Sequence, residues 1–114
     1  MSDVHDAPTM AELVAAVREF LEGDVMGATE GRVQFHTRVA ANVLGMVERE
    51  LALGVAQAAE HATALRRLGV ADEAELAGAI RAGDLDARRD EVIAVVRETV
   101  RAKLEVANPR YLTE

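Results

Sequence analysis

A predicted helix, Phe35–Leu51, carries acidic, basic and amide side chains among its apolar residues, and these are the first candidates for chemistry. At about 100° of rotation per residue, the apolar residues fill nearly half of the helical wheel, which is wider than a surface helix needs. Glu50 and His36 fall within that apolar arc. An imidazole can act as a general base or a metal ligand, and a lone buried carboxylate is unfavourable, so both residues require an explanation.

The residues give little support to metal or nucleophilic chemistry. At helical spacings from His36 the chain offers only arginine, valine and alanine, and it contains no HExxH pattern. His5 and His61 have no better companions. The chain has no cysteine and Ser2 is its only serine, which excludes thiolate and serine nucleophiles. We therefore predict no catalytic residue, no metal and no cofactor.

Three polar residues of the same segment, Arg38, Asn42 and Arg49, share one strip of the helix, with Gly45 leaving a gap between them. The forked donors of arginine suit a carboxylate or phosphate group, so the strip could hold an anionic ligand. It could equally clamp the C-terminal segment or form half of a dimer contact. We favour the structural alternatives and keep the strip as a candidate binding cluster.

Glu50 and Lys103 are the two charges that lie within apolar arcs, and they complete this candidate cluster. A buried charge needs a partner, so one hypothesis pairs them with each other, and another pairs Glu50 with Arg89 or a C-terminal arginine. The favoured alternative is that both side chains reach water along their aliphatic stems.

Composition narrows the class of protein. The 114 residues are 50% apolar and 29% charged, which fits one ordered domain. The net charge of −7 argues against a nucleic-acid partner, because phosphate contacts require clustered basic residues. No apolar run is long enough to span a membrane, and the acidic N-terminus does not resemble a signal peptide. We expect a cytoplasmic protein that contacts no membrane.

The apolar periodicity predicts an all-α fold, a single antiparallel bundle of four main helices and one short helix. Residues 1–8 are predicted to be a disordered tail and residues 9–112 the helical domain. Capping residues and glycines set the expected elements: a helix from Thr9 to Gly23, a loop at 23–32, a central helix ending at Gly54, a helix at 55–68, a short helix from Asp72 to Gly83, and a last helix that Asp84 or Asp86 caps and that ends near Val106.

The chain ends in the run ANPRYL, in which Asn108-Pro109 stops the last helix. The only tyrosine, Tyr111, follows. It would fold back onto the bundle as a packed hook, or it would dock to a partner. The packed hook is favoured, and Asn108, Arg110 and Tyr111 form the candidate docking segment.

Two segments carry a family resemblance, FHTRVAANVLGMVEREL and RETVRAKLEVANPRYL. With them the chain resembles, over residues 9–112, a bacterial family of small helical proteins, domain of unknown function 6285. The resemblance implies genes that commonly stand beside an aminoglycoside-phosphotransferase-like kinase and an acyl-CoA dehydrogenase. It supplies no catalytic role for any residue, and the chain has no kinase motif.

These observations lead to an expected function. We expect a non-catalytic helical accessory protein that binds a protein partner, a kinase-like or acyl-CoA-metabolism enzyme. The alternative is a binding module for an anionic acyl or phosphate ligand, and an enzyme comes third. A core rich in alanine leaves apolar faces wider than a monomer needs, so we also expect a homodimer.

Overall fold

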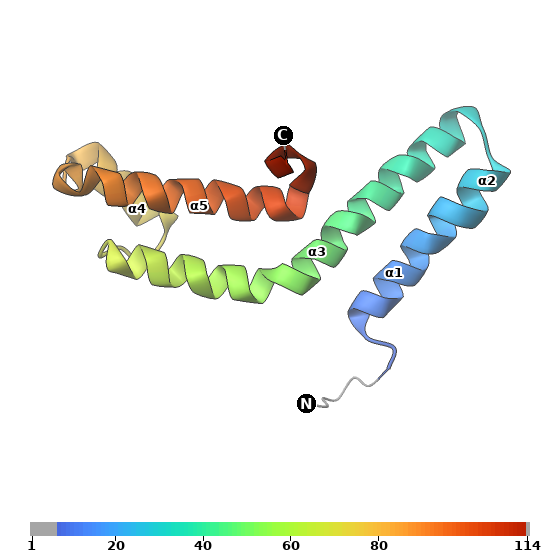
Figure 1. Cartoon of the computed structure of the whole chain (residues 1–114), viewed down its shortest axis with the longest axis horizontal. Coiled ribbons are helices and arrows are strands. Elements are labelled where there is room, and N and C mark those ends of the chain that lie inside the picture. Colours follow the sequence, from blue (N-terminus) through green and yellow to red (C-terminus); the bar gives the residue numbers. More distant parts are fainter. Residues whose placement is uncertain (1–6, 114) are drawn as a thin grey trace. The chain divides into compact units, whose positions relative to one another are not determined.

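The computed structural model describes residues 7–113, so residues 1–6 of the predicted tail, including Ser2 and His5, lie outside the described part. The contacts of the chain form two compact units, Met1–Ala52 and Leu53–Glu114, and each is described by itself. In each unit the neighbouring long helices run antiparallel (Figure 1). Residues 7–113 contain no strand, which confirms the all-α prediction. That residues 9–112 form one domain stays a prediction.

The helices have the following bounds: α1 Met10–Phe20, a π-helical turn η1 Leu21–Val25, α2 Met26–Ala28, α3 Gly31–Arg67, α4 Glu73–Ala82, a 3₁₀ turn η2 Asp86–Arg88, α5 Arg89–Ala107 and a 3₁₀ turn η3 Pro109–Thr113.

The predicted capping box starts α1. The Glu12 amide donates to Thr9 Oγ1 at 3.1 Å, and the Thr9 amide donates to Glu12 Oε1 at 2.7 Å. Two backbone amides at the helix start, those of Thr9 and Glu12, thereby have hydrogen-bond acceptors.

The predicted stop at Gly23 is wrong, because the helix continues through η1 and α2 to Ala28. Gly23 does not adopt the positive φ that ends a helix; among the described glycines only Gly31, Gly69 and Gly83 do. The predicted loop therefore shrinks to a tight turn at Thr29. Gln34 Nε2 stabilises this turn by donating to the carbonyl oxygens of Met26 and Thr29, at 3.1 and 2.9 Å.

The predicted break at Gly54 is also wrong, because α3 runs without interruption from Gly31 to Arg67. A glycine inside a helix costs only about 1 kcal/mol relative to alanine, and neither a proline nor a capping residue follows it here. Two of the expected helices are therefore one. The predicted end at Gly69 is correct: Gly69 has φ 79°, and the Val70 amide donates to the Leu65 carbonyl at 3.1 Å.

The short helix α4 has the predicted ends. Asp72 Oδ1 accepts from the Glu75 amide at 2.8 Å, Glu75 Oε1 accepts from the Ala71 amide at 2.9 Å, and Gly83 ends the helix at φ 81°. Neither Asp84 nor Asp86 caps α5, which corrects that prediction. Instead η2 leads directly into α5, whose N-cap is Arg88 without a side-chain cap. At the other end α5 stops at Ala107, as Asn108-Pro109 predicts.

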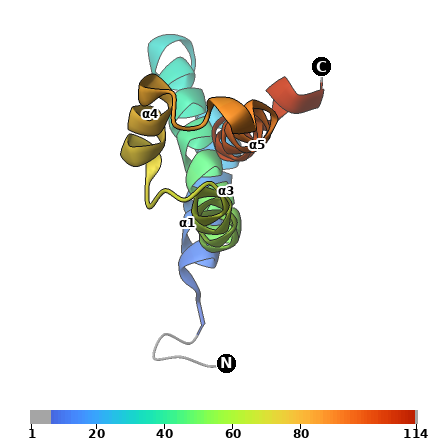
Figure 2. The same ribbon diagram turned by 90° about the vertical axis from the view of Figure 1, so that its left-hand side faces the viewer.

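The core of the second unit lies where α4 packs against the end of α3 and the start of α5. Figure 2 views these two helices almost end-on, with α4 to one side of them. The buried residues are Leu65, Leu68, Leu76 and Leu85, with Val70, Ala79, Val92 and Val95 packed around them. Among residues 7–52 of the first unit, the only hydrophobic residue buried to this degree is Ala41, at 3% exposure.

Candidate functional site

The strip of Arg38, Asn42 and Arg49 lies on α3 in the first unit, with Arg38 and Asn42 exposed and Arg49 half-buried. Arg49 occupies the gap that Gly45 leaves: its Nη1 lies 3.5 Å from the position that a Cβ would take on Gly45. Glycine therefore makes room for an arginine of the same helix. The role of the strip stays a prediction.

Glu50 is exposed on α3, in the first unit, and Lys103 belongs to the second. Within its own unit Lys103 Nζ lies 4.0 Å from Glu73 Oε1, and 69% of its side chain is exposed. The lysine thus extends along the helix surface to water, as its long aliphatic stem allows. An exposed pair of this kind contributes little to stability.

A polar cluster that the sequence did not predict joins three helices of the second unit. Thr99 Oγ1 on α5 donates to the Val95 carbonyl at 2.9 Å and lies 3.3 Å from His61 Nδ1 on α3. The buried His61 Nε2 has no hydrogen-bond partner and faces Glu73 Oε2 at 3.7 Å. Sequence spacing could not reveal this cluster, because Glu73 and Thr99 are distant from His61 along the chain.

The contacts of the same cluster are those of packed helices. Its only hydroxyl, that of Thr99, donates to a backbone carbonyl, so it is not poised as a nucleophile. Among residues 7–113 no three histidine, aspartate or glutamate side chains are grouped as metal ligands. We assign the cluster to the packing of α4 and α5 against α3.

Two further contacts hold α5 against α3. Gln57 Nε2 donates to the Ala102 carbonyl at 3.1 Å and to Glu105 Oε1 at 3.3 Å. Arg88 Nη2 donates to the Arg67 carbonyl at 2.7 Å, and the same guanidinium holds Glu91 through two bonds of 2.8 and 2.9 Å. This ion pair raises the pKa of Arg88 and lowers that of Glu91. Hydrogen bonds therefore fix α5 at both ends.

The C-terminal segment forms the 3₁₀ turn η3, in which the Tyr111 amide donates to the Asn108 carbonyl at 3.1 Å. Asn108 and Arg110 are exposed, and Tyr111 is 67% exposed. Most of the tyrosine surface is therefore uncovered, and the packed hook stays a prediction. That these residues dock to a partner stays a prediction.

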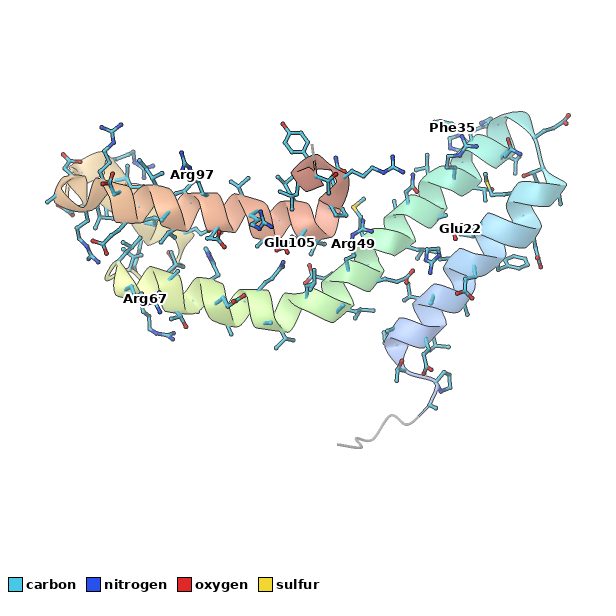
Figure 3. The ribbon with its side chains drawn as sticks, in the orientation of Figure 1. Glu22, Phe35, Arg49, Arg67, Arg97 and Glu105 are labelled. Atoms are coloured by element: carbon cyan, nitrogen blue, oxygen red, sulfur yellow. The ribbon has the colours of Figure 1, made fainter. Side chains whose placement is uncertain are left out.

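Many large apolar side chains are exposed on the surface of both units. Sixteen large apolar or aromatic residues of the described chain are 38% or more exposed, ten of them on α1 and the first half of α3. On α5, Ile93, Val96 and Val100 are 38%, 43% and 50% exposed and follow helical spacing, so they form one stripe. Arg97 points away from α3 on the same helix (Figure 3).

Beside the start of the α5 stripe lies an apolar hollow of about 470 Å³ between α4 and α5, lined by Ile80, Leu85, Asp86, Arg89, Val92 and Ile93. A smaller hollow of about 280 Å³ lies on the first unit and is lined by Leu21, Arg32, Val33, His36, Thr37 and Ala40. Neither hollow is lined by the residues of the Arg38 strip.

The family model described as Domain of unknown function (DUF6285) matches residues 27–111. The chain belongs to this DUF6285 family. The match includes Phe35–Leu51 and nearly all of the C-terminal segment, and it begins after α1. No curated protein and no solved structure matches the chain. In residues 7–113, no helix combines the length and apolar character that crossing a bilayer requires.

Proposed function

We propose that this DUF6285 chain is a non-catalytic helical accessory protein that binds a protein partner through the exposed apolar stripe of α5. The observation that carries the proposal is the stripe of Ile93, Val96 and Val100, which starts beside the hollow between α4 and α5. Apolar residues repeated at helical spacing beside a hollow suit an amphipathic helix of the partner. Aliphatic side chains exposed in a row are otherwise unfavourable in water.

The partner we propose is a kinase-like or acyl-CoA-metabolism enzyme, as the family resemblance implies. Asp86 and Arg89 stand at the edge of the hollow and offer one charge of each sign to such a partner. Polar groups at the rim of an apolar contact contribute specificity more than affinity. The centre of the contact is expected to be the aliphatic stripe itself.

Co-expression of the tagged chain with the kinase-like enzyme tests this proposal. The wild-type chain should retain the enzyme on an affinity column, and Val96→Glu should release it. Val55→Glu is the matched control, since Val55 is already 86% exposed and lies outside the stripe. Repeated failure of the wild-type chains to co-purify, or equal retention by both variants, would overturn it.

The alternative function, binding of an anionic acyl or phosphate ligand to the Arg38 strip, has a separate test. A coenzyme A ester should raise the melting temperature of the wild-type chain and not that of Arg38→Ala. An unchanged melting temperature in both proteins would reject this alternative.

A further inference from the structure

The first unit presents a second apolar surface, which we call the hairpin face. Its members are the exposed apolar residues on one side of the two antiparallel helices: Met10, Leu13, Val17 and Phe20 of α1 and Val33, Val43, Val47 and Leu51 of α3. We propose that a second copy of this chain covers the hairpin face, so that two first units close a four-helix bundle. The proposal concerns a different unit from the partner stripe on α5 and is independent of that function.

The rotation of the two helices shows that these residues share one side. The bond between Arg18 and Glu48, with buried Thr37 and Ala41, marks where α1 and α3 face each other. From that contact line, the exposed stripe of α1 is turned by about 120° and that of α3 by about 90°, in the same sense when each helix is followed along its chain direction. Because the helices run antiparallel, turns of similar size in the same sense bring both stripes to one face.

Phe35 lies outside the hairpin face. It is 57% exposed, and Figure 3 shows it on the side of α3 that is turned away from α1. The smaller hollow lies on the hairpin face itself, between Leu21 of η1 and Val33 and Ala40 of α3. A groove of this kind between two helices accepts side chains from helices packed across it.

The size of the face fits a dimer. Its eight residues are between 39% and 65% exposed. Taking about 170 Å² for each large apolar residue when fully exposed, they present roughly 700 Å², and a stable interface buries about 800 Å² per partner. The face is therefore close to the area that one standard interface requires.

A second copy fits the face better than a single added helix. The hairpin offers two apolar stripes on one face, and a second copy supplies two matching stripes, so that all four helices can turn their stripes towards a common core. A two-fold axis along the bundle allows the same patch to serve both chains. Each helix of one hairpin then meets an antiparallel helix of the other.

The net charges of the two helices favour one pairing of the helices between the two copies. The residues Met10–Ala28 contain four acidic residues and one arginine, a net charge of −3, whereas Gly31–Ala52 contain three arginines and two glutamates, a net charge of +1. Placing α1 of one copy on α3 of the other opposes unlike charges, and placing α1 on α1 opposes like ones. We therefore expect α1 to pack on the second copy's α3.

Sedimentation equilibrium of the full chain tests the dimer. The wild-type chain and the control Val55→Glu should sediment at twice the chain mass of 12.2 kDa, and Val17→Glu should sediment at that mass itself. Circular dichroism confirms that the variants keep their helices. A monomeric wild-type chain at millimolar concentration would overturn the proposal and indicate that the second unit or a different protein covers the face.

Cross-linking tests the arrangement without a destabilising charge. The natural chain has no cysteine, so Val17→Cys and Val47→Cys each introduce a single thiol. Oxidation of the two variants mixed should give several-fold more disulfide-linked dimer than oxidation of either alone, because α1 is expected to face the second copy's α3 at this level. Equal yields from the mixture and from the separate variants would reject the proposed pairing.

Discussion

The guanidinium of Arg18 on α1 donates two hydrogen bonds to the carboxylate of Glu48 on α3, one from Nε to Oε2 and one from Nη2 to Oε1. The same guanidinium donates to Glu22 Oε1 in η1 at 2.7 Å, so one residue of α1 is bonded to both η1 and α3. These bonds raise the pKa of Arg18, chiefly through the hydrogen bond to Glu48. In a unit with little buried apolar surface, this pair sets the register of the two helices.

We predict that Glu48→Gln loosens the first unit and leaves the second unchanged. The amide keeps one acceptor but loses the charge that two guanidinium donors share. Hydrogen exchange followed by mass spectrometry should show faster exchange in α1 and unaltered exchange in α4. Glu22→Gln, which weakens only the bond from Arg18 to η1, should have the smaller effect, and an equal effect of the two variants would contradict this role for Glu48.

The stability of the first turn of α1 should decrease at acidic pH. The Thr9 amide and then the Thr9 hydroxyl lower the pKa of Glu12 in the folded chain. A group with a lowered folded pKa stabilises the fold above its unfolded pKa, and that contribution disappears as the pH falls through the folded pKa. We therefore expect α1 to fray at its N-terminus below about pH 4. In Glu12→Gln, NMR signals of residues 9–13 should lose this pH dependence.

Gln57→Ala should destabilise the second unit by about 1 kcal/mol, since it removes a hydrogen bond to the Ala102 carbonyl between α3 and α5. Urea denaturation measures this change. Glu105→Ala is the control, because it removes the longer bond and leaves Gln57 free to donate to the backbone. A Gln57→Ala variant no less stable than this control would show that the bond does not hold α5.

Two glycines of the same helix should respond in opposite directions to alanine. Gly83→Ala places a side chain at φ 81°, 3.2 Å from Asp86 Oδ2, and should cost about 1–2 kcal/mol. Gly78 lies inside α4 with no atom within 4 Å of a new Cβ, so Gly78→Ala should stabilise by about 0.5–1 kcal/mol. Melting temperatures that move in the same direction would contradict the assigned helix end.

The local features of the fold could be predicted from residue types and their spacing. The caps at Thr9 and Asp72, the glycine end at Gly69 and the stop at Asn108-Pro109 depend on groups within a few residues of one another, so their spacing was sufficient to predict them. Glycine alone was a weaker signal. Gly23 is helical and α3 passes through Gly54, because a glycine ends a helix only where the chain turns to positive φ.

Contacts between groups that are distant along the chain could not be predicted in this way, because they form only when the helices pack together. Arg88 bonds to the Arg67 carbonyl, His61 lies against Thr99, and Arg18 holds Glu48, although each pair is separated by twenty residues or more. Helical periodicity fixes which side of a helix is apolar, but it does not fix which apolar sides remain uncovered. Which apolar sides remain uncovered depends on how many helices pack together. The hairpin face could therefore be recognised only from the packing of α1 against α3.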